Sequence, residues 1–513
     1  MNCATVLDYW ADYQPDREAV ICQSYRITYQ ALRSRVNQLA HGLLGLGVRK
    51  NDKIALLLDN SIEMVETNFA LSKIGACMVP LNFRLRTEDI QFFVRHSEAV
   101  GLIYHDFLET QVVGEATVDL GLRWICRVGE GNFGTHLSYE NIMGNGAREK
   151  SPGLPDADMD DIQAIMYTSG STGQPKGAML SHGNWIWNAI GFNLILGADT
   201  LKVGAVAIPM FHTAGLHAIV FPVLFGGGTV VVLPLRHGFS PSDLASAIAG
   251  ESVTYTYMAP EMWTMLAHDS QSQSYDFSSM QRCLSAGGVL PEKTHETLLR
   301  NFGLDVAKCY GLTEAGPLVT ISTPTMQAAN GDAVGQPVSF CDVRLVDDHD
   351  VDVSVGEVGE CIIRGPNVCQ GYFKAPEVTE LYMKNGWAHT GDLLRMDRNH
   401  LYYFVSRKKD MIKSGGENIF ATEVEEVLNH HPKISESAVI GVPHPKWGEG
   451  IKALIVVVKN EVLTEAEVLD YCRLSLAGYK KPQFIEFVDA IPKLVTGKVD
   501  KVALRQRYGS LYQ

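Results

Sequence analysis

The chain of 513 residues is too long for a single hydrophobic core, so we expect two or more domains. Hydrophobic residues make up 46% of the sequence and charged residues 20%, which is ordinary for a globular protein. The net charge of −14 argues against a surface that coats nucleic acid, so no nucleic-acid partner is expected.

Cysteine spacing and the lengths of apolar runs indicate the cellular compartment in which the protein is expected. The ten cysteines form no C-x-x-C pair and suggest no disulfide framework, which fits a reducing, cytoplasmic compartment. No basic segment followed by an apolar stretch comes after Met1, so no signal peptide is expected. No run approaches the ~18 apolar residues that a membrane span needs. The sequence therefore predicts a cytoplasmic protein without a membrane span.

The first 150 residues alternate helix and strand patterns. Apolar residues from Leu32 to Leu43 recur at spacings of three and four, which predicts one helix face. The continuous apolar run at 54–58 is typical of a buried parallel strand. A helix pattern at 64–74 and a strand pattern at 78–81 follow, and the alternation resumes from 164 to about 320. These patterns predict α/β organisation.

The stretch 166–177, MYTSGSTGQPKG, is the most informative in the chain. An apolar run leads into it, so the loop is expected to leave a buried strand. Small residues let the backbone approach a phosphate closely, hydroxyls and amides donate to its oxygens, and lysine adds positive charge. The expected phosphate-binding residues are Thr168, Ser169, Gly170, Ser171, Thr172, Gly173 and Lys176.

A P-loop is the obvious alternative, but that motif needs glycine before its lysine and serine or threonine after it. Pro175 and Gly177 flank Lys176 instead. Proline has no N–H to donate to a phosphate, and glycine has no hydroxyl for Mg²⁺. A flexible Ser/Gly linker, the other alternative, has no need of a Pro-Lys-Gly ending before an apolar continuation. The stretch therefore predicts a phosphate loop of a different design.

Further short motifs are spread over the rest of the chain. From 335 to 405 short strand patterns alternate with turn signals, which predicts a β-rich subdomain. About a hundred residues follow the charged run 407–410, a usual size for a small domain. The motifs are 209–215 (PMFHTAG), 285–288 (SAGG), 310–314 (YGLTE), 387–392 (WAHTGD), 406–410 (SRKKD), 414–418 (SGGEN) and 492–498 (PKLVTGK).

Together the loop and these motifs resemble the adenylate-forming superfamily, which includes acyl-CoA synthetases, peptide-synthetase adenylation domains and beetle luciferases. They follow the order and approximate spacing of that family over about 165 to 500. The resemblance implies an α/β multidomain fold. A large N-terminal domain of α/β subdomains and a β-rich subdomain would span 1–406, a hinge 407–410, and a small mobile α+β domain 411–513.

The resemblance also implies which residues bind adenine and the α-phosphate. Gly287 and Gly288 belong to a stretch that would lie against the adenine ring. Tyr310, followed by Gly311, would stack on that ring, and Thr313 would contact the α-phosphate.

Charged residues would bind the metal and the ribose, and one would neutralise the charge that develops during adenylation. Glu314 would hold Mg²⁺, because carboxylate oxygen suits this hard cation. Asp392 would accept hydrogen bonds from the ribose hydroxyls, and Arg407 would add ribose and phosphate contacts. Family members usually carry Gly or Asp where this chain has Ser406. Lys498 would neutralise charge on the carboxylate and α-phosphate during adenylation.

Other implied roles concern the change between two half-reactions. His212 would border the acyl pocket and position substrate. Lys409 stands at the hinge position of the family. Gly415, Gly416 and Glu417 belong to the loop that would turn into the site for the thioester step, where adjacent glycines let backbone line a narrow tunnel.

The implied enzyme is an acid–thiol ligase, an AMP-forming acyl-CoA synthetase that uses ATP, Mg²⁺ and coenzyme A. A carboxylate would attack the α-phosphate of ATP, and a thiol would then attack the acyl-adenylate. Peptide-synthetase domains usually place an aspartate after the phenylalanine of the histidine motif. Here Phe211 is followed by His212 and Thr213, so an α-amino acid is not the expected substrate.

The candidate pocket walls favour a medium- or long-chain fatty acid or an aryl acid. They are Phe211, His212, Thr213, Tyr255, Tyr257 and Met258. The two tyrosines fit an alternating strand with ordinary core side chains equally well. A ligase for a small polar acid and an enzyme that loads a carrier protein remain alternatives, and self-association into a homodimer is left open.

Overall fold

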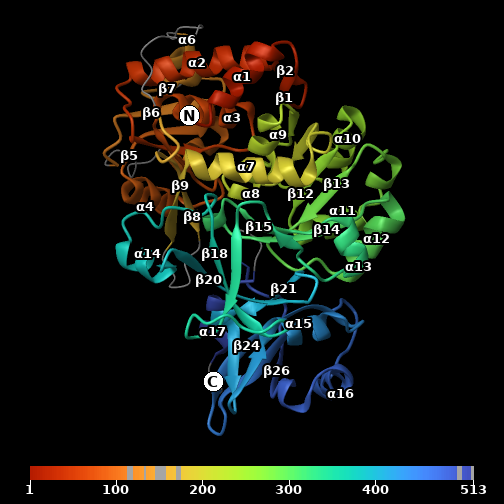
Figure 1. Cartoon of the computed structure of the whole chain (residues 1–513). Helices are drawn as coiled ribbons and strands as arrows, with labels where there is room; N and C mark the ends of the chain where they lie inside the picture. The colour runs from red at the N-terminus through yellow and green to blue at the C-terminus, as the bar shows by residue number, and fades with distance from the viewer. Residues whose placement is uncertain (113–119, 132–133, 145–156, 169–174, 494–498, 510–513) are drawn as a thin grey trace. The chain divides into compact units, whose positions relative to one another are not determined.

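The computed structural model describes residues 1–112, 120–131, 134–144, 157–168, 175–493 and 499–509. The chain divides into two compact units (Figure 1). The first unit contains residues 1–343 and 363–388, and the second contains 344–362 and 389–513.

A mainly parallel sheet of seven strands forms one half of the first unit, in the order β7-β6-β5-β3-β4-β8-β9. Every pair is parallel except β8 and β9, which form an antiparallel hairpin at one edge. The strands are β3 (Lys53–Leu57), β4 (Cys77–Pro80), β5 (Ala99–His105), β6 (Trp124–Val128), β7 (Leu137–Ser138), β8 (Ile162–Thr168) and β9 (Lys176–Ser181).

Helix α2 forms where the apolar spacing predicts a helix. Helix α2 (Tyr29–Gly45) buries Leu32, Val36, Leu39 and Leu43 completely, as their helical spacing requires. Thr28 caps this helix by accepting a hydrogen bond from the Ala31 N–H. Helix α1 (Thr5–Tyr13) packs against α2 at the red end of the chain (Figure 1).

A second sheet of nine strands has the order β16-β15-β14-β13-β12-β10-β11-β1-β2. The pairs from β14 to β1 are parallel, and antiparallel strands close both edges. The strands are β1 (Glu18–Cys22), β2 (Tyr25–Thr28), β10 (Val203–Val206), β11 (Thr229–Val232), β12 (Tyr255–Met258), β13 (Arg282–Ser285), β14 (Val306–Gly311), β15 (Leu318–Ile321) and β16 (Gln336–Pro337). The 285–288 and 310–314 motifs therefore begin at the carboxyl ends of neighbouring parallel strands, where open α/β sheets bind ligands.

The other helices of the first unit connect these strands. They are α3 (Ile62–Ile74), α4 (Thr87–Ser97), α5 (Glu109–Val112), α6 (Tyr139–Gly144), α7 (His182–Leu196), α8 (Thr213–Gly215), α9 (Phe221–Phe225), α10 (Pro241–Glu251), α11 (Pro260–His268), α12 (Glu292–Phe302), α13 (Pro324–Ala329) and α14 (Pro376–Tyr382). A π-helical turn, η3 (Leu216–Val220), and a 3-10 turn, η5 (Thr313–Ala315), follow two of the sequence motifs.

A smaller sheet has the order β17-β18-β20-β19, with β21 paired to β20. Its strands are β17 (Asp342–Val346), β18 (Val358–Arg364), β19 (Met383–Lys384), β20 (Trp387–Met396) and β21 (Tyr402–Arg407). The boundary between the units falls within β17, β18 and β20. The β-rich region predicted for 335–405 is confirmed by these strands.

The C-terminal part of the second unit is a mixed sheet with α-helices beside it. The sheet runs β23-β22-β25-β24, with β26 paired to β25. The elements are η6 (Lys408–Asp410), β22 (Met411–Ser414), β23 (Glu417–Phe420), α15 (Ala421–Asn429), β24 (Ile434–His444), β25 (Gly448–Val457), α16 (Glu465–Ser475), β26 (Phe484–Phe487) and α17 (Lys501–Tyr508). Helices α15 and α16 bury Val424, Leu428 and Val468 against the sheet. This α+β unit matches the prediction.

The ten cysteines, all among the described residues, form no disulfide, and nine of them are buried. Among the described residues, none of the helices combines the length and apolar character that crossing a bilayer requires.

Candidate active site

The predicted phosphate loop connects the two strands of the β8–β9 hairpin. Thr168 ends β8 and lies opposite Lys176, the first residue of β9. The Thr168 hydroxyl donates to the Lys176 carbonyl oxygen at 3.5 Å. The leading strand buries Gln163 to Met166, so the prediction that the loop leaves a buried strand is confirmed. Ser169, Gly170, Ser171, Thr172 and Gly173 lie outside the described residues.

Tyr372, which lies outside the sequence motifs, contacts both Lys176 and the carboxylate predicted to hold metal. The Tyr372 hydroxyl donates to Oε1 of Glu314 at 2.7 Å. The Lys176 ammonium lies 5.7 Å from the centroid of the Tyr372 ring, within cation–π range. Tyr372 and Glu314 are both buried. Tyr372 thus links a cation and a carboxylate beside the predicted phosphate loop.

Electrostatics keep the Tyr372 hydroxyl a donor. Burial raises the pKa of Tyr372 far above its ordinary value, and the neighbouring Glu314 carboxylate raises this pKa further. The phenol therefore stays protonated at neutral pH, and the hydrogen bond to Glu314 has a fixed direction.

One side-chain amide holds the turn that carries Thr313 and Glu314. Asn367 donates to the carbonyl oxygens of Ala315 at 2.9 Å and Leu318 at 3.2 Å. Glycine is required at position 311 of the same motif, because a Cβ on Gly311 would stand 2.0 Å from the Pro317 carbonyl oxygen.

The predicted adenine-contacting residues lie at the ends of β13 and β14. Tyr310 is buried near the end of β14. Gly287 and Gly288 follow β13 and are exposed, and Gly287 has a φ of +90°, which favours glycine. Both segments therefore lie at the same edge of the nine-stranded sheet, as the resemblance implies for one binding site.

The His212 segment is fixed by a buried asparagine from the other sheet. Asn60 follows β3 and accepts a hydrogen bond from the Met210 N–H at 2.8 Å. Its amide donates to the carbonyl oxygens of Ile208 at 2.9 Å and Leu233 at 3.1 Å. The Asp59 carboxylate accepts from the Leu235 N–H. The carboxyl ends of β3, β10 and β11 are therefore joined two residues before His212.

Replacing Asn60 by alanine is expected to loosen this junction. Three buried backbone groups would lose their partner, so we expect the free energy of unfolding to fall by about 3 kcal/mol. The measurement is urea denaturation, with the exposed Asn301→Ala variant as the control. Equal stability of the two variants would show that the junction does not depend on the Asn60 amide.

The candidate acyl-pocket residues differ in their surroundings. Phe211 is buried in the core cluster of the seven-stranded sheet, with its ring 5.6 Å from Phe83. The partly exposed His212 has its ring 4.4 Å from that of Phe211. Tyr255 is completely buried, and its hydroxyl donates to the Ala218 carbonyl oxygen at 2.8 Å.

The remaining pocket candidates are buried as well. Tyr257 stands two residues further along β12, on the same face as Tyr255, and Thr213 begins α8. The hydrogen bond to Ala218 holds the Tyr255 side chain beside η3, and the pocket role of the two tyrosines stays a prediction.

In the second unit, Asp392 and Arg407 are cross-strand neighbours. They pair across β20 and β21, with the Arg407 Nε 3.7 Å from an Asp392 carboxylate oxygen. The Asp392 N–H donates to the Thr390 hydroxyl at 3.1 Å, and that hydroxyl donates to the Cys361 carbonyl oxygen at 2.7 Å. The predicted ribose acceptor is therefore held beside its predicted cationic partner.

The predicted hinge run is tied to its surroundings on both sides of Lys409. The Lys408 ammonium lies 2.9 Å from a carboxylate oxygen of Asp348 and 2.9 Å from one of Glu360. Arg505 of α17 lies 2.8 Å from an Asp410 carboxylate oxygen and donates to the Lys409 carbonyl oxygen at 3.3 Å. Sequence patterns gave no signal for these partners, which are up to 96 residues away.

The predicted thioester-step loop is a two-residue hairpin turn. Ser414 and Glu417 pair across β22 and β23, and Gly415 and Gly416 have φ values of +61° and +89°. The Gly415 N–H donates to the Trp447 carbonyl oxygen at 2.9 Å, and a Cβ on Gly415 would lie 3.3 Å from the Trp447 ring. Glu417 is exposed, and Lys498 lies outside the described residues.

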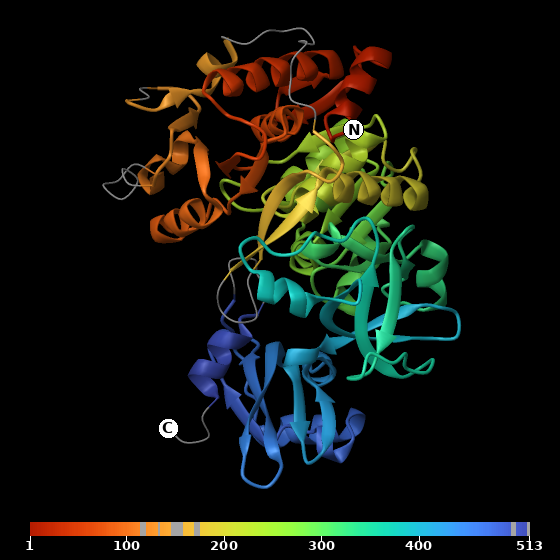
Figure 2. The ribbon, with the colours of Figure 1, turned by 60° about the vertical axis from the view of Figure 1, so that its left-hand side comes forward.

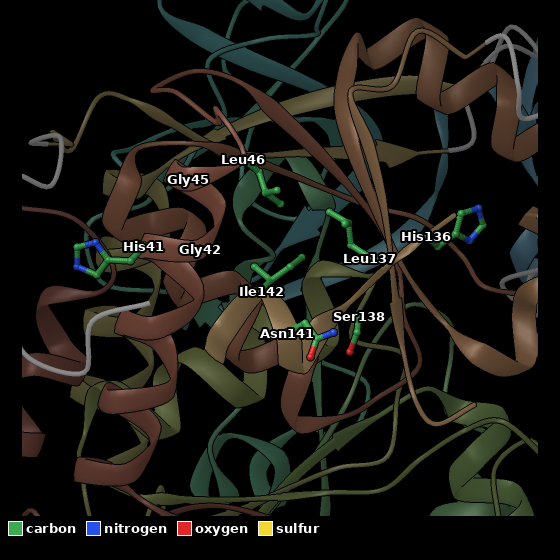
Figure 3. A pocket seen from close by; sticks show the side chains of 9 residues that line it. All are labelled: His41, Gly42, Gly45, Leu46, His136, Leu137, Ser138, Asn141 and Ile142. Atoms are coloured by element: carbon green, nitrogen blue, oxygen red, sulfur yellow. The ribbon is translucent and has the colours of Figure 1, made fainter. Parts of the chain in front are cut away.

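A separate cavity of about 410 Å³ lies in the first unit between α2 and the β7–α6 segment (Figure 3). Gly42, Leu46, Leu137 and Ile142 line it, and no predicted site residue does. The imidazole of His41 points away from the other labelled side chains (Figure 3). This cavity therefore does not belong to the candidate active site.

Comparisons with known proteins agree with this geometry. Residues 7–373 match the family model of the AMP-binding enzymes, and residues 423–498 match the model of the AMP-binding enzyme C-terminal domain. The chain is 38% identical over 501 residues to a feruloyl-CoA synthase from an Amycolatopsis species, with 97% of each chain covered.

Solved structures give the same result. The anthranilate CoA ligase AuaEII in complex with anthranoyl-AMP superposes with a TM-score of 0.88 at 27% identity, covering 99% of this chain and 97% of that one. The o-succinylbenzoate CoA synthetase MenE from Bacillus subtilis, in complex with its acyl-adenylate intermediate, has a TM-score of 0.86 at 29% identity, with 98% and 97% covered. The prediction of an ATP-dependent acid–CoA ligase acting through an acyl-adenylate is confirmed by these relatives. The chain belongs to the AMP-binding enzyme family.

Proposed function

We propose that this protein joins an aryl acid, of the hydroxycinnamate class to which ferulate belongs, to coenzyme A. The observation that carries the proposal is the 38% identity to a feruloyl-CoA synthase over 97% of both chains. The two structural relatives described above are also ligases named for aryl acids. The neutral sequence after Phe211 supports an acid without an amine, because burying an unpaired ammonium would cost several kcal/mol.

The proposed mechanism depends on positioning and on charge stabilisation. An oxygen of the substrate carboxylate attacks the α-phosphorus of ATP, and the bond to pyrophosphate breaks. The 168–176 loop holds the phosphates, Thr313 contacts the α-phosphate, and Lys498 stabilises the charge that develops. The thiol of coenzyme A then loses its proton and attacks the acyl carbon. The bond between that carbon and the phosphate oxygen breaks, and AMP leaves with its electron pair.

Mg²⁺ fits the chemistry of the Glu314 site. A buried carboxylate beside the phosphate loop supplies the oxygen donor that this cation prefers. When bound, Mg²⁺ neutralises charge on the triphosphate. We also propose that Asp392 and Arg407 bind the ribose and that Tyr310, Gly311, Gly287 and Gly288 surround the adenine. Phe211, His212, Thr213, Tyr255 and Tyr257 are proposed around the acyl group.

The proposed domain motion places a hinge at 407–410 between 1–406 and 411–513. Gly415, Gly416 and Glu417 would then enter the site for the thioester step. We also propose a cytoplasmic location, because the ten cysteines form no C-x-x-C pair and their spacing suits a reducing compartment. A homodimer remains a prediction, which light scattering of the purified protein tests.

The substrate proposal is tested by measuring pyrophosphate release with a panel of acids, each with and without coenzyme A. The panel contains ferulate, benzoate, octanoate, a long-chain acid, acetate, a dicarboxylate and leucine. We expect kcat/KM for ferulate to exceed that for acetate by about 100-fold, because each buried methylene-sized group contributes roughly 0.8 kcal/mol.

Each other result would identify a different enzyme. Fastest turnover of acetate or a dicarboxylate would make the protein a ligase for small acids. Adenylation without thioester formation in the presence of coenzyme A would favour an enzyme that loads a carrier protein. Pyrophosphate release with leucine would contradict the assignment to the acyl-CoA synthetase branch.

A further inference from the structure

Tyr372 is fixed to the strand that leaves the phosphate loop. The segment 370–373 runs beside β9, whose hairpin with β8 can be followed in Figure 2. The Met179 N–H donates to the Gly371 carbonyl oxygen at 2.9 Å, and the Phe373 N–H donates to the Gly177 carbonyl oxygen at 2.8 Å. Tyr372 itself bridges to Ala178. The tyrosine backbone is therefore part of the same sheet edge as Lys176.

Local contacts hold the Tyr372 backbone on its other side. Its N–H donates to the Thr379 hydroxyl at 2.9 Å. A Cβ on the preceding Gly371 would stand 2.4 Å from the Thr379 methyl carbon, and Gly371 has a φ of +113°. Only glycine allows this close approach. The position of the Tyr372 backbone is thus set by both neighbouring segments.

The hydroxyl contacts a carboxylate whose orientation matters for a cation. Rotation about the last bond of a glutamate side chain is broad, so a carboxylate without a strong donor samples many orientations. A hydrogen bond of 2.7 Å to one oxygen restricts that rotation. Such contacts to metal-binding groups typically change metal affinity about 10- to 100-fold when removed.

We propose that Tyr372 is a positioning residue that orients the Glu314 carboxylate toward the Mg²⁺ of the nucleotide before ATP binds. The proposal rests on the proposed function of Glu314 as the metal-binding residue. No bond is made or broken by Tyr372, and its proton stays on the phenol. The chain thereby couples the metal site to the strand that carries Lys176.

The test uses Tyr372→Phe, with Tyr382→Phe as a matched control. Tyr382 is buried beside Tyr372, with ring centroids 5.4 Å apart, and its hydroxyl has no hydrogen-bond partner among the described residues. Both substitutions remove one buried phenolic oxygen from the same cluster. Only the first removes a hydrogen bond to Glu314.

Binding of ATP to the whole enzyme is measured by calorimetry without acid or coenzyme A, first in EDTA and then over a Mg²⁺ titration. ATP affinity should increase with Mg²⁺ concentration. In Tyr372→Phe we expect the concentration that gives half of this increase to be about 10-fold higher than in the wild type. ATP affinity in EDTA should stay unchanged, and Tyr382→Phe should match the wild type in both conditions. Tyr372→Phe added to Glu314→Gln should cause no further change.

Several outcomes would overturn the proposal. These are an unchanged Mg²⁺ dependence in Tyr372→Phe, equal changes in both phenylalanine variants, an additive loss in the double variant, or misfolding of Tyr372→Phe alone. The last outcome would make the hydroxyl structural. Failure of the wild type to release pyrophosphate with any aryl acid would instead contradict the proposed substrate, which this binding experiment does not contain.

Discussion

Replacing Lys498 by alanine should abolish acyl-adenylate formation and leave the conversion of supplied acyl-AMP and coenzyme A to thioester intact. A lysine that neutralises charge in the first transition state contributes nothing to the attack of the thiol. Removing one such group typically costs about 100- to 1,000-fold in rate, and a full charge costs more. The first step is measured by ATP–pyrophosphate exchange, and the second by thioester formation from synthetic acyl-AMP.

The segment offers a matched control for this variant. Lys493 belongs to the same motif, but its ammonium forms an ion pair with Glu436 at 2.9 Å near the surface. Lys493→Ala should therefore keep both half-reactions close to the wild-type rates, because exposed ion pairs contribute little. Loss of exchange in Lys493→Ala as well would assign the effect to the segment as a whole.

Gly415→Leu should produce the opposite separation. Gly415 has a φ of +61°, and a Cβ there would lie 3.3 Å from the Trp447 ring. A leucine would strain the turn and fill the space that the loop needs for the thioester step. Gly356 has a φ of +94° with open space around it, so Gly356→Leu controls for backbone strain alone. If Lys498→Ala and Gly415→Leu lose the same half-reaction, the proposed division of labour is wrong.

The parts of the fold that sequence could predict are those with local signals. Helix α2 and strand β3 follow from the spacing of apolar residues, because each element must bury one face or both. The composition of the 166–177 stretch predicts a phosphate loop, and the described residues at its two ends pair as a hairpin. Such features depend on neighbours within a few residues.

Contacts between distant segments could not be predicted in the same way. Tyr372 meets Glu314 over a separation of 58 residues, and Asn60 meets Met210 over 150. A lone tyrosine or asparagine carries no pattern that indicates its partner, because the two residues come together only when the two sheets pack. Tyr255 shows a different limit of sequence patterns. Its alternating strand is a clear local pattern, but that pattern fits a pocket wall and a core residue equally well.

The predicted hinge run, 407–410, has a local signal in its charges and also has partners from distant segments. The charged residues of this run carry no pattern that indicates burial, yet the Asp410 side chain is only 10% exposed beside Arg505. The contacts of Lys408 with Asp348 and Glu360 also come from outside the motif. These contacts fix the residues on either side of Lys409, so a rotation must be taken up by few backbone angles.

Replacing Lys409 by proline is therefore expected to separate the two half-reactions. Proline fixes φ near −65° and restricts the residue before it, so the backbone around Lys409 could no longer take up a large rotation. We expect adenylation to survive and thioester formation to fall by about 100-fold or more, as when a required conformational step is blocked. Lys409→Ala removes the same side chain but keeps the backbone free, and it should retain both rates. Single-turnover measurements of each step decide the matter. Unchanged turnover in both steps of Lys409→Pro would remove this residue from the mechanism, whereas equal losses in the proline and alanine variants would assign the effect to the lysine side chain.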